Sequence, residues 1–173
     1  VLDSPMVRVC VVQGPSGSGK TTLVRSWVAQ REHAAIWISL ASGIATRQTF
    51  WQHVAGSVAR IGDLSPAAVS RVRNQLGAAV DPVHIAETLL DEAGPVVLVL
   101  DAYEHLAEAM PAVDADLVRL VTAVPTLRVM VTTRGTTALT DFDPPEGGIV
   151  RVVTLGELAL TSEEIGVLIA AQT

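Results

Sequence analysis

Short aliphatic runs alternate with helical patterns along this chain, and this alternation limits the folds that the chain can adopt. Five short, mainly apolar runs read as strands, namely residues 6–13, 35–40, 96–100, 127–131 and 149–153. The run 96–100 is wholly aliphatic and is expected to be buried on both faces. Helical spacing of apolar residues fills the segments between the five runs. Strands joined through helices form right-handed crossovers and therefore lie parallel. The sequence predicts an α/β fold of three αβα layers around a mainly parallel five-stranded sheet.

The predicted helices have recognisable faces and starts. One apolar face consists of Phe50, Trp51, Val54, Val58 and Ile61. Ser65-Pro66 and Asp81-Pro82 each place a capping side chain before a proline at the first helical position. A capping box formed by Thr161 and Glu164 starts the last predicted helix.

Composition supports one globular domain over residues 1–173. The chain is 49% hydrophobic and 17% charged, which excludes disorder and collagen-like repeats. No aliphatic run approaches the roughly 20 residues of a membrane helix, and no signal segment opens the chain. A single cysteine, Cys10, excludes an internal disulfide and a zinc cluster, and we read it as a small buried hydrophobe. We therefore expect a soluble, cytoplasmic protein without membrane contact.

Charge is unevenly distributed along the chain. The net charge is −6, yet residues 1–60 carry six basic and two acidic side chains, whereas residues 61–173 carry six basic and sixteen acidic ones. No basic stripe suits a nucleic acid, so we expect no direct nucleic-acid binding by this segment. The positive first third is compatible with a small-anion site or with an ordinary solvated surface.

A glycine-rich loop between the first strand and the first helix is the most specific motif. It satisfies G-x-x-x-x-G-K-[ST], and its strand–loop–helix setting is the one that this phosphate-binding motif requires. Backbone N–H groups and the helix N-terminus would bind phosphate oxygens, with Lys20 on the β- and γ-phosphates and Thr21 on Mg²⁺. The predicted nucleotide-binding residues are Gly14, Pro15, Ser16, Gly17, Ser18, Gly19, Lys20, Thr21 and Thr22.

Two further strand ends carry candidate catalytic residues. Asp101 ends the run 96–100, where a phosphoryl-transfer site needs a carboxylate for Mg²⁺, so Thr21 and Asp101 are the predicted metal ligands. The separation from Lys20 leaves room for an extra strand between the loop strand and the acid strand. Arg134 follows the run 127–131 and would face the same edge of the sheet as a γ-phosphate sensor; the alternative is a surface charge.

The residue that activates water is less clearly marked. Ala102 stands where many ATPases carry a second acid, and Glu104 is the nearest substitute. Glu104 is therefore a candidate catalytic residue with Lys20, Asp101 and Arg134. The alternative is a solvated glutamate at a helix N-terminus.

Together these segments resemble the STAND class of signal-transducing P-loop ATPases, in particular the nucleotide-binding domain of large LuxR-type and maltose-activator-like bacterial regulators. The resemblance rests on GPSGSGKTTL at 14–23, VVLVLDAYEHL at 96–106, LRVMVTTR at 127–134 and LALTSEEIGVLI at 158–169, with AIWISL at 35–40 and FWQHV at 50–54. It implies an ATP/ADP-binding, Mg²⁺-dependent switch with slow ATP hydrolysis. It also implies partner domains of the parent chain, namely a winged helix, a sensor array and a DNA-binding domain, from which this domain would be excised.

Two other functions fit the same loop. A small-molecule kinase would use GPSGSGKTT in the same way, but the segment after Arg134 lacks the arginine-rich lid of such enzymes. A degenerate module that binds nucleotide without hydrolysis would explain Ala102.

Overall fold

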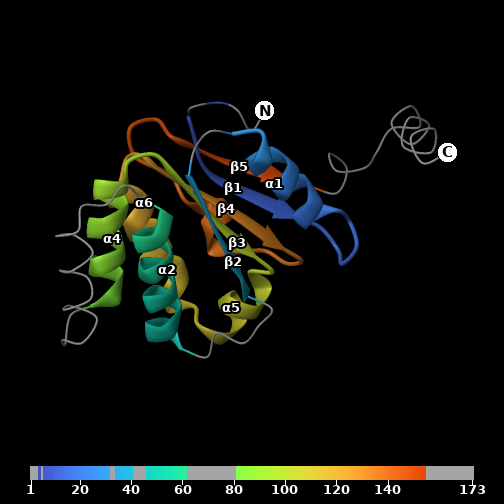
Figure 1. Cartoon of the computed structure of the whole chain (residues 1–173). Coiled ribbons are helices and arrows are strands. Elements are labelled where there is room, and N and C mark those ends of the chain that lie inside the picture. Colours follow the sequence, from blue (N-terminus) through green and yellow to red (C-terminus); the bar gives the residue numbers. More distant parts are fainter. Residues whose placement is uncertain (1–3, 5, 32–33, 41–45, 62–80, 155–173) are drawn as a thin grey trace.

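The computed structural model describes residues 4, 6–31, 34–40, 46–61 and 81–154. Its centre is a five-stranded sheet in the order β2-β3-β4-β1-β5 (Figure 1). The strands are β1 (Val7–Gln13), β2 (Ala34–Ser39), β3 (Val96–Asp101), β4 (Leu127–Thr133) and β5 (Ile149–Val153). Every neighbouring pair is parallel. The predicted α/β class is confirmed, and the described sheet is wholly rather than mainly parallel.

Helices cover both faces of the sheet. Helix α1 (Lys20–Ala29) lies across the strands from the group formed by α2 (Arg47–Ile61), α4 (Pro82–Ala93) and α6 (Ala112–Ala123) (Figure 1). Two separate apolar clusters result, because alternate residues of each strand point to opposite faces. The larger cluster joins Val9 and Val11 of β1 to α2, α4 and α6, and the smaller one joins Cys10 and Val12 to Val24 of α1. Cys10 is a buried hydrophobe, as expected.

The sheet order brings three strand ends together. Strand β4 lies between β1, which leads into the glycine-rich loop, and β3, which ends in Asp101. Gly14 N donates to Thr133 O over 3.1 Å and so extends the β1–β4 pairing into the loop. Because the strands are parallel, their carboxyl ends form one edge of the molecule.

Helix starts and faces mostly follow the sequence. Asp81 caps α4, since its side chain accepts from Val83 N over 3.2 Å and Pro82 stands at the first turn. The predicted face of α2 is buried at Phe50, Trp51, Val54 and Val58. The prediction was wrong for Ile61. This residue is the last of α2 and is 37% exposed, because the helix ends beyond the edge of the core.

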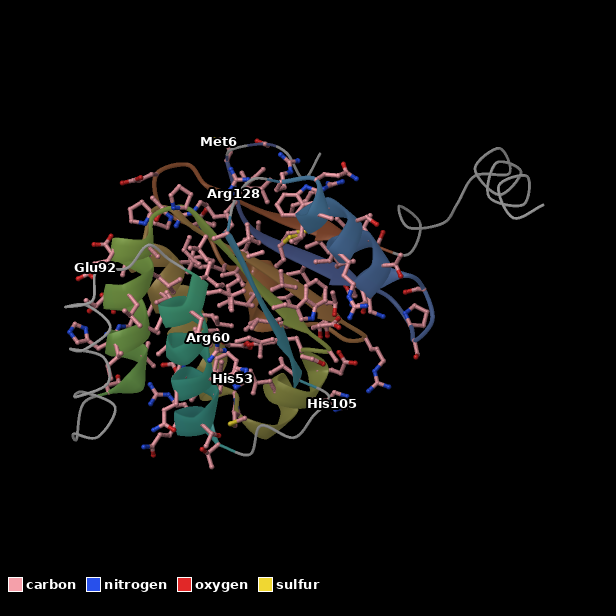
Figure 2. The ribbon with its side chains drawn as sticks, in the orientation of Figure 1. Met6, His53, Arg60, Glu92, His105 and Arg128 are labelled. Atoms are coloured by element: carbon pink, nitrogen blue, oxygen red, sulfur yellow. The ribbon has the colours of Figure 1, made fainter. Side chains whose placement is uncertain are left out.

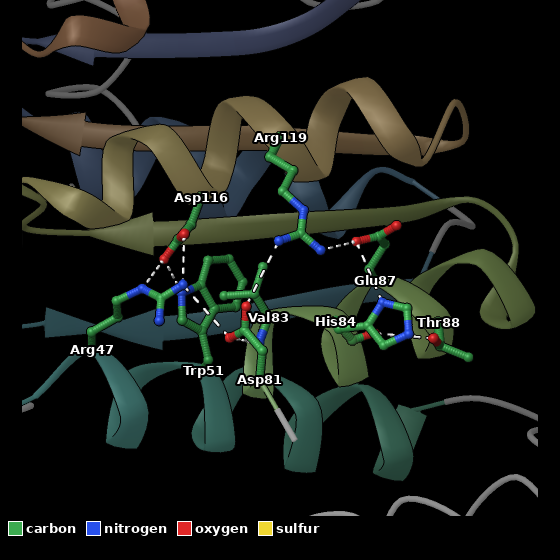
Figure 3. A network of polar contacts seen from close by, with 9 residues as sticks. All are labelled: Arg47, Trp51, Asp81, Val83, His84, Glu87, Thr88, Asp116 and Arg119. Atoms are coloured by element: carbon green, nitrogen blue, oxygen red, sulfur yellow. Dashed lines mark hydrogen bonds and ion pairs between the residues drawn. The ribbon is translucent and has the colours of Figure 1, made fainter. Parts of the chain in front are cut away.

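A polar network ties the three helices of the larger layer together (Figure 3). Asp116 of α6 accepts from Arg47 Nε over 2.6 Å and Nη2 over 2.8 Å, and also from Trp51 Nε1 over 2.8 Å. Arg119 of α6 reaches Glu87 of α4 over 3.0 Å. These contacts join α2, α4 and α6 beneath the sheet, and Asp116, only 9% exposed, has its charge balanced by a bidentate guanidinium.

Two short elements were not predicted from periodicity, namely α5 (Glu104–Ala109), expected only as the helix N-terminus in the alternative reading of Glu104, and a 3₁₀ turn (Ala138–Asp141). Both are shorter than the span over which helical periodicity is readable. The helices predicted after Ser65-Pro66 and Thr161 lie outside the described residues. Among the described helices, none is long and apolar enough to cross a membrane.

Candidate functional site

The glycine-rich loop closes directly onto the first turn of α1. Gly17 and Gly19 have φ angles of 79° and 83°, in the left-handed region that glycine adopts without a Cβ penalty. Gly19 is the N-cap of α1 and, as a glycine, has no side chain to cap the N–H groups of that first turn. The loop therefore presents a helix N-terminus that can bind an anion.

Lys20 is the first residue of α1 and is 9% exposed. Its Nζ donates to the carbonyls of Gly14 over 2.7 Å and Pro15 over 2.8 Å. No carboxylate contacts Nζ among the described residues. The ammonium group is thus held inside the loop by neutral acceptors, which an anion can replace.

Thr21 and Asp101 meet at the mouth of the loop, as the sequence predicts. Thr21 Oγ1 donates to Asp101 Oδ1 over 2.9 Å, although 80 residues separate them in the chain. Thr132 Oγ1 donates to the same Asp101 oxygen over 2.5 Å and accepts from Ala102 N over 3.0 Å. Sequence reasoning missed Thr132, which the structure buries to 1% exposure. The available signal was a pair of threonines, Thr132 and Thr133, directly after the apolar run that ends at Val131.

Ala102 adopts a backbone that alanine rarely occupies. Its φ is 63°, and the turn is held on both sides by Thr132, whose Oγ1 accepts from Ala102 N and whose carbonyl accepts from Tyr103 N over 2.8 Å. Tyr103 is fully buried, and its hydroxyl donates to Asp114. Burial raises the pKa of the Tyr103 hydroxyl far above its usual range and the Asp114 carboxylate raises it further, so this group stays a donor. These contacts fix the direction in which Glu104 leaves the strand.

Glu104 and Arg134, predicted separately as catalytic residues, form an ion pair. Arg134 Nε lies 2.6 Å from Glu104 Oε1, and Arg134 N donates to Oε2 over 3.2 Å. Burial alone would raise the pKa of the Glu104 carboxyl. The bonds from its own backbone N–H and from Arg134, with the charge of the guanidinium, hold the pKa below its usual range instead. Glu104 is thus ionised and engaged, with 13% of its side chain exposed against 52% for Arg134.

These groups line one cavity of about 570 Å³. Most of the predicted site residues share it: Ser16, Gly17, Ser18, Gly19, Lys20, Thr21, Thr22, Asp101, Glu104 and Arg134, together with Ala102, His105 and Thr132. Gly14 and Pro15 contribute carbonyls to Lys20 rather than cavity wall. The sequence predictions therefore converge in space.

The residues present fit a Mg²⁺-bound polyphosphate. Ser18 Oγ is buried and has no partner among the described residues, so it can bond to a phosphate oxygen. Mg²⁺ in nucleotide sites takes one or two protein ligands and completes its shell with water and phosphate, as Thr21 and Asp101 allow. Within the described part of the chain, no group of three or more histidine, cysteine or carboxylate side chains could hold a metal.

Solved structures share the fold at low identity. A Walker-type ATPase of Pyrococcus abyssi is 15% identical at a TM-score of 0.50, over 86% of this chain and 49% of that one. A structure of Drosophila ORC bound to DNA is 17% identical at a TM-score of 0.53, over 88% of this chain and 39% of that one. A structure of Drosophila ORC bound to AT-rich DNA and Cdc6 is 10% identical at a TM-score of 0.55, over 96% of this chain and 57% of that one.

The chain therefore covers only part of the length of each of these solved chains, from 39% to 57%. None of the curated protein sequences matches it. A family model for the AAA ATPase domain matches residues 2–131, well over half of the chain. With this match and its P-loop, parallel sheet and Thr21–Asp101 contact, the chain belongs to the AAA ATPase domain family.

Proposed function

We propose that this domain is an ATP/ADP-binding switch with slow Mg²⁺-dependent ATP hydrolysis. The convergence of Lys20, Thr21 and Asp101 on one cavity carries the proposal, because an ammonium, a hydroxyl and a carboxylate at this spacing suit phosphates and Mg²⁺ together. Lys20 would exchange its two carbonyl partners for β- and γ-phosphate oxygens. Thr21 and Asp101 would hold Mg²⁺, which supplies neutralisation of the charge that develops on the phosphates.

The ion pair at the cavity rim supplies the switch. A γ-phosphate is a stronger acceptor for Arg134 than one carboxylate, since it carries more charge and more oxygens. ATP would therefore draw Arg134 away from Glu104, whereas ADP would leave the pair intact. The freed Glu104 carboxylate can accept a proton from an attacking water.

Slow hydrolysis follows from the weakness of the base. Without ATP, Glu104 accepts two bonds from Arg134 and its pKa is held low. Once ATP draws Arg134 away, Glu104 is an ordinary carboxylate, whose pKa still lies well below neutral pH. Ala102 brings no second carboxylate to the cavity. The domain would then keep ATP long enough to report its presence.

The setting of the switch is also part of the proposal. The STAND resemblance implies a bacterial transcription regulator in which residues 1–173 are the nucleotide-binding domain beside winged-helix, sensor and DNA-binding domains, in the cytoplasm. The two ORC structures contain DNA, but this segment has a net charge of −6 and we assign DNA contact to the absent domains.

Nucleotide binding is tested first with the purified chain. Denaturation and chromatography identify any bound nucleotide, and calorimetry measures the affinity for Mg-ATP and Mg-ADP. Lys20→Ala and Thr21→Val should each weaken binding by at least tenfold. The matched control is Thr122→Val, because Thr122 is an exposed helical threonine that bonds only to its own helix. Absence of bound nucleotide and of measurable Mg-ATP affinity would refute the proposal.

The switch itself is tested at the rim. Arg134→Ala should lose the discrimination between ATP and ADP, and Glu104→Gln should retain ATP binding while ATP turnover falls. Equal ADP and ATP affinities in both Arg134→Ala and the original full-length protein would argue against a switch. Transfer of labelled γ-phosphate to a small acceptor would favour a kinase instead, and multiple ATP turnovers abolished by Glu104→Gln would exclude a non-hydrolysing module.

A further inference from the structure

A second cavity, of about 240 Å³, lies at the opposite edge of the sheet, beside the amino ends of β3 and β4. Pro95 and Pro125 form part of its wall with Thr126, and two arginines, Arg8 and Arg128, line it. In Figure 2, Arg128 lies at the end of the sheet away from His105, which lines the nucleotide cavity. The two cavities are therefore separate sites.

Arg8 is held rigidly at this edge although it is charged and only 8% exposed. Its Nε donates to Leu127 O over 3.2 Å, and its Nη2 donates to Val121 O over 2.6 Å and Val124 O over 2.8 Å. The two bonds from Nη2 satisfy carbonyls at the C-terminal end of α6, and the bond from Nε reaches the first residue of β4. The two N–H groups on Nη1 have no acceptor among the described residues.

Arg128 is the neighbour of Arg8 across the sheet. The register pairs Val9 with Val129, so the two arginines precede paired residues on adjacent strands, and both line this cavity. Arg128 is half-buried and makes no hydrogen bond or ion pair with any described residue. Like charges in this position destabilise a sheet unless an anion compensates them.

The described residues compensate these charges only in part. None of their carboxylates lines the cavity or forms an ion pair with either arginine, and Glu146 acts on Arg8 through its charge alone. Burial lowers the pKa of the Arg8 guanidinium, the charge of Glu146 offsets this in part, and the charge of Arg128 lowers it further. The bonds that cap α6 account for the burial of the Arg8 guanidinium. Arg128 has no comparable partner among the described residues.

We propose that a compact oxyanion, a phosphate group or a carboxylate, binds between Arg8 and Arg128. Guanidinium groups recognise both through paired N–H donors. The cavity is smaller than the roughly 300–1,000 Å³ of sites for drug-sized ligands, so it suits a small ion and not a nucleotide. This site does not depend on what the glycine-rich loop binds.

Calorimetric titrations with inorganic phosphate and with succinate test the site. Arg128→Met should weaken binding of the preferred ion by about tenfold or more, as expected for loss of a charge-assisted contact. Arg60→Met is the control, because Arg60 is an exposed arginine on α2 that bonds to Ser57. Both titrations are repeated on Lys20→Ala, so that phosphate bound at the glycine-rich loop cannot be mistaken for this site.

NMR localises the binding without a variant of Arg8, which would lose the bonds that cap α6. Phosphate or succinate should shift the amide signals of Val96, Val97 and Thr126. A response to phosphate alone identifies a phosphate site, and a response to succinate alone identifies a carboxylate site. Shifts confined to residues 14–22, or equal affinities in Arg128→Met and the original chain, would overturn the proposal.

Discussion

Thr132→Val tests how the ends of β3 and β4 are held together. Valine has nearly the shape of threonine, so the substitution removes one hydroxyl from a site that is 1% exposed and leaves the packing almost unchanged. That hydroxyl donates to Asp101 Oδ1 and accepts from Ala102 N. The substitution therefore removes two hydrogen bonds at the strand end that carries the candidate Mg²⁺ ligand.

The size of the effect follows from these two bonds. A bond to a charged carboxylate contributes about 1.5–3 kcal/mol, and a buried N–H left without a partner costs about 1–3 kcal/mol. Asp101 is half-exposed, so water replaces part of the first loss. We expect a destabilisation of about 2 kcal/mol. With a urea m-value of about 2 kcal/mol/M, the unfolding midpoint would fall by about 1 M.

Urea unfolding followed by circular dichroism measures this change, and calorimetry measures the affinity for Mg-ATP in parallel. Thr133→Val is the matched control, because Thr133 is equally buried and adjacent but its hydroxyl accepts only from Gly135 N over 3.2 Å. We expect the control to lose less than about 1 kcal/mol and to keep its Mg-ATP affinity. Equal losses in the two variants would show that the Asp101 and Ala102 contacts contribute nothing specific.

Three further predictions concern backbone and charge. Ala102→Gly should raise the thermal midpoint slightly. Glycine removes the backbone strain of about 1–2 kcal/mol that alanine has at φ 63°, and this exceeds the gain of about 0.4–1 kcal/mol that the more flexible unfolded chain obtains from glycine. A lower midpoint would contradict this. Gly148→Ala should destabilise by about 1–3 kcal/mol in urea unfolding, since its Cβ would lie 2.7 Å from Arg8 Cγ, and an unchanged midpoint would show that the arginine stem yields freely. The ion pair of Glu104 contributes stability that is fully present above the unfolded-state pKa of glutamate and is lost as pH falls through the lower folded-state pKa. Arg134→Met should therefore flatten the acid limb of a plot of stability against pH, below about pH 5 where glutamate begins to take up protons. Parallel acid limbs would refute that account.

The sequence predicted the strands well because their patterns are local. Each of the five aliphatic runs became a strand with ends within about two residues of the expected ones, and β5 matches the expected range. Asp81 was recognisable as a cap for the same reason. Ile61 was misplaced because periodicity identifies the side of a helix and not where the neighbouring layer ends.

The candidate site was predictable residue by residue but not as an arrangement. The glycine-rich loop and Asp101 could be assigned because their chemistry requires a fixed motif or a fixed strand end. The Glu104–Arg134 pair and the role of Thr132 could not, because they depend on which strands are neighbours. Strand order is set by packing of the whole layer and leaves no local sequence signal.

That strand order gives β4 a central position in the proposed switch. The Thr132 hydroxyl bonds to Asp101 at the end of β3, the Thr132 carbonyl accepts from Tyr103 N, and Arg134 bonds to Glu104. Thr133 O accepts from Gly14 N of the glycine-rich loop. A γ-phosphate that moves Arg134 therefore acts on a strand end that already contacts both the loop and the segment from Asp101 to Glu104. Because Thr132 and Arg134 are two residues apart on one chain, the Mg²⁺ ligand and the water-orienting carboxylate would respond to the same displacement. The strained turn at Ala102 lies between Asp101 and Glu104. Its relaxation in Ala102→Gly should therefore weaken the coupling between the responses of these two carboxylates.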